Sequence, residues 1–190
     1  MKTGLFFGSF NPVHVGHMII ANYVVQHTDL QQVWMVVSPH NPLKEKASLA
    51  NDYDRFHLVQ LAIGDNANLR ASDIEFSLPK PSYTIDTLTY LQEKYPTKQF
   101  ALIMGGDNLA SLNRWKNYEL LLRDYDIYVY KRPQYELGEF ANAPRVKVVE
   151  APLLDLSATY IRSQIKAGNS VQYLVPDAVY EYLQGSTLYL

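Results

Sequence analysis

The sequence contains no cysteine, which excludes both disulfide bonds and thiolate metal sites. It has no apolar run of the roughly 20 residues that a membrane-spanning helix needs, and its first residues lack the basic-then-apolar pattern of a secretory signal. Neither sign of charge is in large excess, because the formal net charge of the 190 residues is -2. A chain with this balance is poorly suited to neutralising the phosphates of a nucleic acid polymer. These absences predict a cytoplasmic protein whose partners include neither a membrane nor a nucleic acid polymer.

The composition is otherwise typical of a globular protein that folds in water. Hydrophobic residues make up 47% of the chain and charged residues 19%. A length of 190 residues can bury a substantial core, and no linker, repeat or low-complexity tract divides it. We therefore expect a single domain over residues 1–190. The sequence leaves open whether copies of the chain assemble into a homo-oligomer.

Apolar runs alternate with helical patterns along the chain, which predicts strands separated by helices. Several strands are apolar along their whole length, and this favours a parallel sheet covered on both faces. The predicted fold class is therefore α/β, with a doubly wound parallel sheet. Expected strands cover residues 3–7, 32–38, 69–76, 99–105, 125–131 and 145–151. Expected helices cover residues 17–29, 54–63, 84–95, 158–168 and 177–185, with short helices between residues 107 and 123.

The segment GSFNPVHVGH, residues 8–17, follows the first expected strand and places two histidines three residues apart. Gly8 allows a sharp turn and a close approach of the backbone to a ligand. If His14 and His17 lie in the first turn of the next helix, both imidazoles can point to one place, beside unpaired amides that favour phosphate. A capping or packing histidine is the structural alternative. A zinc site is disfavoured, because the spacing is not i, i+4 and the glutamate of the helical zinc motif is missing.

This segment resembles the signature of the nucleotidyltransferase superfamily that carries the HxGH motif. Near the other end of the chain, LSATYIRSQI is similar to the second signature, a cluster of serine and threonine followed by Ile-Arg. Two central segments, PSYTIDTL and GGDNLASLNRWKNYELLL, resemble those of bacterial nicotinate-nucleotide adenylyltransferases. The similarity spans nearly the whole chain in the family's order. It implies a Rossmann-like nucleotidyltransferase fold and a role in NAD biosynthesis, with ATP and nicotinate mononucleotide as partners.

Enzymes of that family let the 5′-phosphate of nicotinate mononucleotide attack the α-phosphorus of ATP, which gives deamido-NAD and pyrophosphate. Because the nucleophile is already an anion near neutral pH, no strong general base is required. Catalysis then rests on aligning the phosphates and stabilising the charge that develops on them. Mg2+ is expected to arrive bound to the phosphates of ATP and to water, since Asn11 stands where the first signature more commonly has aspartate. No residue is predicted as a metal ligand.

The resemblance also implies roles for individual residues. His14 and His17 would contact the ATP phosphates, with His17 closest to the transition-state charge, and Arg162 would neutralise the pyrophosphate. Arg55 matches an arginine that opens the corresponding helix in relatives, but a surface ion pair explains it too and it is not assigned. The assigned residues are His14, His17 and Arg162 as catalytic; Gly8, Ser9, Phe10, Gly105, Asp107, Ser157 and Thr159 as ATP-binding; and Lys44, Ser82, Tyr83, Thr84 and Trp115 as mononucleotide-binding.

Structural explanations stay open for several of these assignments. Ser157 and Asp107 can each cap a helix, and residues 82–84 can be an ordinary helix start. Lys44 can be a solvated loop lysine. Trp115 can belong to the core, although its polar neighbours favour stacking on a cationic pyridinium.

Other functions compete with this interpretation. The nearest is adenylylation of nicotinamide mononucleotide or of another phosphate such as phosphopantetheine, and only the central segments favour nicotinate. A dehydrogenase-like dinucleotide binder is disfavoured, because the G-x-G-x-x-G expected after the first strand is missing. A non-catalytic nucleotide sensor on the same fold would bind ATP without releasing pyrophosphate.

Overall fold

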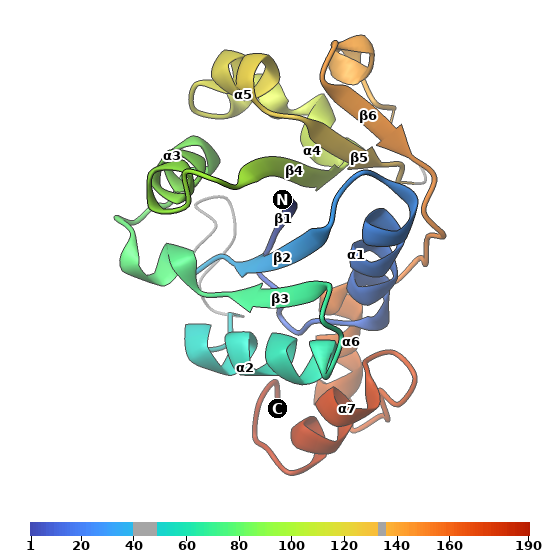
Figure 1. Ribbon diagram of the computed structural model, residues 1–190. Helices are drawn as coiled ribbons and strands as arrows, with labels where there is room; N and C mark the ends of the chain where they lie inside the picture. The colour runs from blue at the N-terminus through green and yellow to red at the C-terminus, as the bar shows by residue number, and fades with distance from the viewer. Residues whose placement is uncertain (40–48, 133–135) are drawn as a thin grey trace.

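The computed structural model describes residues 1–39, 49–132 and 136–190. Within these ranges, six strands form one parallel sheet with helices on both faces (Figure 1), which confirms the predicted fold class. The strands are β1 (Lys2–Gly8), β2 (Gln32–Val37), β3 (Leu69–Ser72), β4 (Gln99–Gly105), β5 (Ile127–Tyr130) and β6 (Val146–Val149). The helices are α1 (Val15–His27), α2 (Asp52–Ile63), α3 (Thr84–Lys94), α4 (Gly106–Ala110), α5 (Tyr118–Asp124), α6 (Ala158–Lys166) and α7 (Asp177–Gln184).

The strands lie in the order β3-β2-β1-β4-β5-β6, so the chain moves outward from β1 in one direction and later from β4 in the other. β1 pairs with β2 on one side, with Gly8 opposite Val37, and with β4 on the other, with Phe6 opposite Ile103. The carboxyl ends of β1 and β4 are therefore neighbours at the point where the strand order reverses. Sheets of this type bind ligands at that point.

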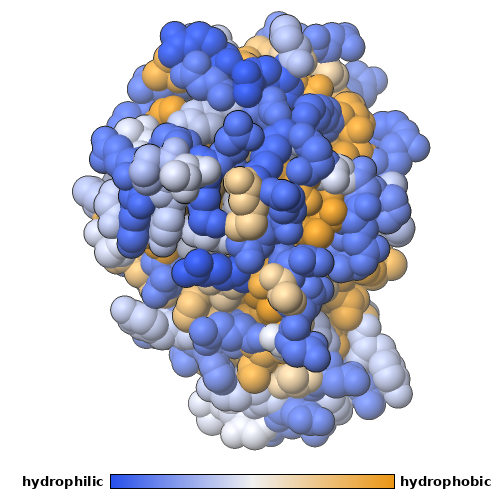
Figure 2. Space-filling model, in the orientation of Figure 1, coloured by the Kyte–Doolittle hydropathy of each residue, from blue (hydrophilic) through white to orange (hydrophobic). Residues whose placement is uncertain are grey.

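Alternate strand residues enter two apolar cores, one on each face of the sheet. Phe6 and Met35 pack on the face that holds α1, α2, α6 and α7. Leu5 and Trp34 pack on the opposite face, against α3, α4 and α5. Burial on both faces explains why the strands read as continuous apolar runs. The face of the molecule shown in Figure 2 is mostly hydrophilic, with small hydrophobic groups. No helix in the described ranges is long and apolar enough to cross a membrane.

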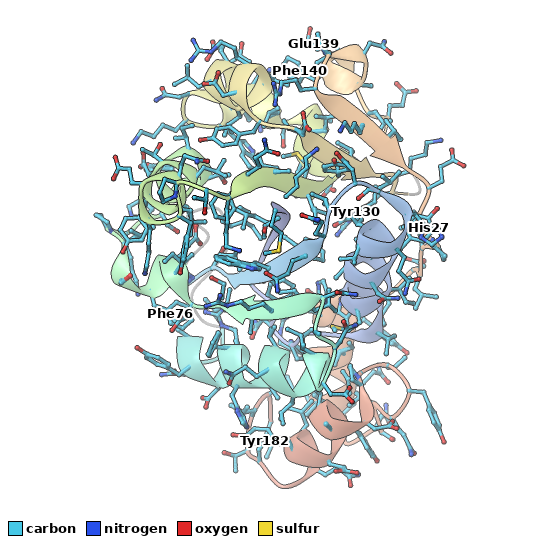
Figure 3. All side chains as sticks on the ribbon, viewed as in Figure 1. His27, Phe76, Tyr130, Glu139, Phe140 and Tyr182 are labelled. Atoms are coloured by element: carbon cyan, nitrogen blue, oxygen red, sulfur yellow. The ribbon has the colours of Figure 1, made fainter. Side chains whose placement is uncertain are left out.

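The two C-terminal helices return to the face that holds α1. Ile161 of α6 and Val179 of α7 are fully buried in the core on that face. Tyr182 of α7, labelled in Figure 3, packs edge-on against His57 of α2. Their ring centres are 5.0 Å apart. α6, which carries most of the C-terminal signature, thus lies beside the turn that follows β1.

The prediction of a strand over residues 69–76 is wrong in extent. β3 ends at Ser72, and Ile74–Ser77 form a 3-10 helix instead. The reason is a polar side chain: Glu75 is only 2% exposed, and its Oε1 accepts a hydrogen bond of 2.8 Å from the Thr87 hydroxyl of α3. The 3-10 helix turns Glu75 inward toward α3, which a continued strand would not do.

Candidate active site

The turn between β1 and α1 brings the two histidines together. His14 is the N-cap of α1 and His17 lies in its first turn, and their rings stack with centres 3.7 Å apart at an interplanar angle of 28°. The His14 amide donates a hydrogen bond of 3.2 Å to His17 Nδ1. Because Nδ1 accepts this bond, a neutral His17 ring carries its proton on Nε2 and presents that nitrogen as a donor.

Aromatic rings pack directly on the backbone of this turn. Phe10 has a φ of 44°, is 1% exposed, and packs edge-on against His17 with ring centres 5.0 Å apart. A Cβ atom at Gly8 would lie 2.9 Å from the Phe10 ring, and one at Gly16 would lie 3.1 Å from the His14 ring. Glycine at both positions therefore makes room for the rings that form the turn.

Burial sets the charge of His14. Its side chain is 6% exposed, and burial lowers its pKa to about 4, with the positive charge of Arg132 acting in the same direction. His14 is therefore neutral at pH 7. At that pH it offers polar contacts to a ligand in the turn, but no positive charge.

The pKa of His14 predicts a pH dependence of stability. An unfolded histidine has a pKa of about 6.5, so protonation favours the unfolded chain between that value and the folded value of about 4. The free energy of unfolding has its full value above about pH 6.5. It falls by roughly 3 kcal/mol as the pH is lowered from there to about 4. We expect H14Q to lose this part of the pH dependence in denaturant unfolding measured between about pH 7 and pH 4.5. H27Q, at the exposed end of α1 (Figure 3), should keep it, and equal pH slopes for H14Q and the parent would contradict the burial argument.

The C-terminal signature meets the histidine turn from the other end of the chain. Ser157 is the N-cap of α6, and its hydroxyl accepts a hydrogen bond of 3.1 Å from the Tyr160 amide, so the predicted cap is confirmed. Arg162 donates from Nη1 to the Asn11 carbonyl at 2.8 Å, and its Nη2 lies 3.4 Å from Thr159 Oγ1. The two signatures, 151 positions apart at this contact, are thus joined by a hydrogen bond from the Arg162 guanidinium to the backbone of the histidine turn.

A carboxylate and a second arginine lie at the neighbouring strand ends. Asp107 is in α4 directly after β4, where Gly105 and not Asp107 occupies the N-cap. A Cβ atom at Gly105 would lie 2.5 Å from Asp107 Oδ1, so a larger residue there would displace the Asp107 carboxylate. Asp107 Oδ1 lies 3.5 Å from Arg132 Nε. Arg132 was not predicted from the sequence, although a basic residue two positions after an apolar strand was an available signal.

Arg55 is buried and holds the backbone in place, whereas the sequence also allowed it to form an ion pair on the surface. It is fully buried, and its guanidinium donates to the carbonyl oxygens of Ser9 at 2.6 Å, Ser38 at 2.9 Å and Ala50 at 2.9 Å. It also pairs with Asp52 at 2.6 Å. Because Ser9 and Ser38 follow β1 and β2, Arg55 ties together the backbone that leaves these two strands beneath the histidine turn.

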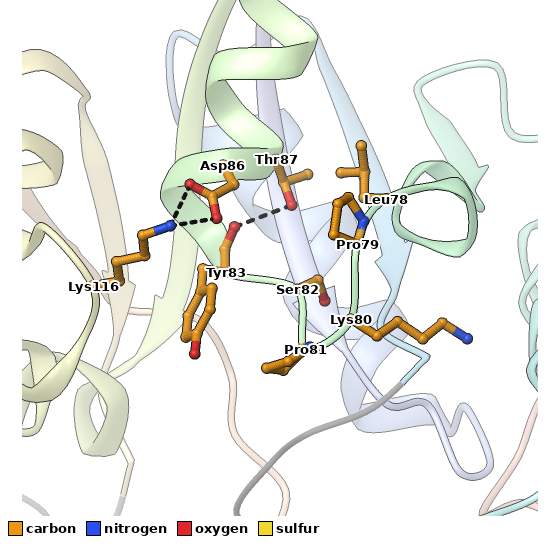
Figure 4. Close-up of a pocket in the computed structure, with 9 residues that line it drawn as sticks. All are labelled: Leu78, Pro79, Lys80, Pro81, Ser82, Tyr83, Asp86, Thr87 and Lys116. Carbon is orange, nitrogen blue, oxygen red and sulfur yellow. Dashed lines mark hydrogen bonds and ion pairs between the residues drawn. The ribbon is translucent and has the colours of Figure 1, made fainter.

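The predicted mononucleotide segment borders a pocket of about 380 Å³ (Figure 4). Ser82 and Tyr83 line it just before α3, and Asp86 and Thr87 line it from the first turns of that helix. Lys116, from the segment before α5, closes another side. Hydroxyl, aromatic and charged groups thus lie along a pocket whose remaining lining is mainly apolar, a mixture typical of small-molecule sites.

Two other residues assigned to the mononucleotide, Thr84 and Trp115, do not line this pocket. Thr84 is the first residue of α3, directly after Tyr83. Trp115 is partly buried and packs against the core beneath α3, α4 and α5, so it is its neighbour Lys116 that lines the pocket. Lys44 lies outside the described residues.

The described ranges contain no group of three histidine, aspartate or glutamate side chains that could hold a metal ion. Asn11 is 4% exposed, and its Oδ1 accepts a hydrogen bond of 3.1 Å from the Ala50 amide. The Asn11 side chain therefore anchors the histidine turn to the segment before α2.

Comparison with known proteins identifies the relatives of this chain. The model of the cytidylyltransferase-like family matches residues 5–164, a range that holds every assigned site residue. A protein of Cytophaga hutchinsonii described as a probable nicotinate-nucleotide adenylyltransferase is 53% identical over 189 residues, which cover 100% of this chain and 98% of that protein. One from Flavobacterium psychrophilum with the same description is 50% identical over 191 residues, covering 100% and 99%. The chain belongs to the nicotinate-nucleotide adenylyltransferase family.

Solved structures share the fold of this chain. Plasmodium falciparum nicotinic acid mononucleotide adenylyltransferase complexed with NaAD matches with a TM-score of 0.84 at 18% identity, over 99% of this chain and 97% of that one. Its complex with APC matches with a TM-score of 0.81, over 99% and 96%. At this identity the likeness establishes the Rossmann-like fold expected of a nicotinate-nucleotide adenylyltransferase.

Proposed function

We propose that this chain transfers the adenylyl group of ATP to nicotinate mononucleotide, giving deamido-NAD and pyrophosphate, and that residues 1–190 act as one domain. The observation that supports this most directly is the contact between Arg162 and the Asn11 carbonyl at 2.8 Å. It joins the two signatures around the start of α1, where the positive end of the helix dipole favours phosphate. Family membership supports the same reaction.

The side chains of the turn would hold and neutralise phosphates rather than remove a proton. The mononucleotide phosphate is an anion at neutral pH, so one of its oxygens can attack the α-phosphorus directly. As that bond forms, the bond from the α-phosphorus to its bridging oxygen breaks, and pyrophosphate leaves with the electron pair. His17 would donate from Nε2 to the α-phosphoryl group and Arg162 to the pyrophosphate, stabilising the charge that develops on each.

The remaining assigned residues would bind the nucleotides. The backbone of Gly8, Ser9 and Phe10 would lie along ATP, and Ser157 and Thr159 would donate to its outer phosphates. Asp107, at the end of β4, would approach the ribose of the adenylyl nucleotide from beside Gly105. The mononucleotide would occupy the neighbouring region formed by Ser82, Tyr83, Thr84 and Trp115, with Lys44 reaching a phosphate.

Mg2+ would enter with ATP, held by its phosphates and by water. Such an ion would offset part of the triphosphate charge during transfer. The protein around the turn fits this arrangement, because the Asn11 oxygen already accepts from the Ala50 amide and Asp107 pairs with Arg132. No side chain of the turn is assigned to the ion.

Pyrophosphate release by the purified protein tests this function. ATP and magnesium are supplied with nicotinate mononucleotide or with nicotinamide mononucleotide at equal concentration. We expect a strong preference for the acid. Equal use of both would keep adenylyl transfer and overturn the assignment of the substrate, whereas release with neither would favour another phosphate acceptor or a nucleotide sensor.

A further inference from the structure

An ion pair closes one side of the pocket beside α3 (Figure 4). Lys116 Nζ lies 2.8 Å from Asp86 Oδ2 and 3.0 Å from Asp86 Oδ1. The same ammonium lies 5.0 Å from the centre of the Tyr83 ring, within range of a cation–π contact. The pair thus bridges the start of α3 and the segment before α5, the two stretches assigned to the mononucleotide.

The ammonium of Lys116 has capacity for one more hydrogen bond. A lysine ammonium carries three N–H donors, and the two oxygens of Asp86 take up two of them. Since Lys116 lines the pocket, the third donor is available to a group bound there. A carboxylate would form a charge-assisted bond with it, which is stronger than the bond to a neutral amide oxygen.

We propose that Lys116 is a specificity-determining residue that selects the acid form of the pyridine mononucleotide, and that Asp86 holds its ammonium at the pocket wall. This inference rests on the proposed function. The positive charge of Lys116 offsets the negative charge of Asp86. A pyridine carboxylate that enters the pocket can therefore bond to the ammonium without net repulsion from Asp86. Without Lys116, the Asp86 carboxylate would face the substrate carboxylate alone and repel it, whereas a neutral amide would be little affected.

The start of α3 supplies a second, independent attraction for an anion. The first backbone amides of this 11-residue helix lack intrahelical partners, and the helix dipole is positive there. These groups stay in place in any variant of Lys116. Loss of Lys116 should therefore weaken the preference for the acid without abolishing it.

The test compares kcat/KM for nicotinate mononucleotide and nicotinamide mononucleotide in K116M and in the parent. We expect K116M to lower the ratio of acid to amide by about tenfold, through the acid alone, with kcat/KM for the amide within about twofold of the parent. K94M is the matched control, because Lys94 is exposed at the other end of α3 and its Nζ lies 5.5 Å from the centre of the Tyr90 ring. K94M should leave the ratio unchanged.

A double variant separates charge from structural damage. K116M/D86N removes both charges, so its ratio of acid to amide should recover by at least about threefold relative to K116M. The effect of K116M should also shrink between low salt and about 0.5 M salt, because screening weakens charge interactions at a half-exposed pair. Recovery and salt dependence are not expected if methionine merely distorts the pocket.

The outcomes distinguish this inference from the proposed function. A parent that prefers the acid, together with a K116M ratio within about twofold of the parent, would overturn the role of Lys116 alone. Equal losses for acid and amide in K116M, without recovery in K116M/D86N, would also overturn it. A parent that releases pyrophosphate with neither mononucleotide would overturn both.

Discussion

Replacing His17 by alanine is expected to lower kcat by about 10³ while the protein stays folded. The His17 ring is held by the His14 amide at Nδ1, at 3.2 Å, and stacks on the His14 ring, so its Nε2 proton has a fixed direction. A donor fixed in this way can stabilise charge on the α-phosphoryl group without reorganising during the reaction. The measurement is steady-state turnover with ATP and nicotinate mononucleotide, accompanied by thermal unfolding.

The matched control is His27→Ala, at the last turn of the same helix. His27 is exposed there (Figure 3) and stacks on Tyr23, away from the turn that holds His17. H27A should keep turnover within about twofold of the parent. An H17A protein that is folded and within about tenfold of the parent would refute the catalytic role assigned to His17.

Replacing Arg162 by alanine is expected to lower kcat/KM for ATP by about 10³. The change removes two things at once: the charge that would offset the pyrophosphate, and the bond to the Asn11 carbonyl that holds α6 against the histidine turn. Removal of the charge acts on the transition state and should lower kcat. Loosening of the turn acts on binding as well and should raise KM for ATP. Steady-state kinetics over a range of ATP concentrations separates the two effects.

Lysine at the same position tests whether charge alone is enough. R162K keeps the positive charge but cannot donate to the Asn11 carbonyl, to Thr159 and to a phosphate in the planar geometry of a guanidinium. We expect it to recover less than about a tenth of the activity lost in R162A. Lys166→Ala, exposed in the last turn of α6, is the control and should leave kinetics unchanged. An R162A protein with kcat/KM within about tenfold of the parent would contradict the assignment.

The fold could be predicted where local pattern and tertiary packing agree. β4 occupies residues 99–105, as expected, because its residues are apolar and lie in the middle of a sheet that is covered on both faces. The prediction failed at Glu75, where a buried hydrogen bond to Thr87 on α3 replaces the end of a strand with a 3-10 helix. That partner lies 12 residues away, beyond what the periodicity of one segment can indicate.

The motifs of the candidate site could be predicted from the sequence, whereas the residues that hold those motifs in place could not. His14, His17 and Arg162 follow from two signatures, and the return of α6 to the sheet face that holds α1 then explains why the signatures meet. Arg55 and Arg132 depend on distant partners: Arg55 bonds to the Ser9 carbonyl, 46 positions away, and Arg132 pairs with Asp107 across neighbouring strand ends. Such contacts arise only when the sheet is assembled. An isolated arginine in the sequence is equally consistent with a surface position.

The most direct test of the central claim follows the α-phosphorus itself. The purified protein is given ATP carrying a radioactive α-phosphorus, magnesium and nicotinate mononucleotide, and the labelled products and pyrophosphate are quantified together. Adenylyl transfer predicts that all of the transferred label appears in deamido-NAD, with one pyrophosphate released for each molecule formed. Label in free AMP, or ADP and inorganic phosphate in place of pyrophosphate, would contradict it, as would labelled ATP that stays bound and unchanged.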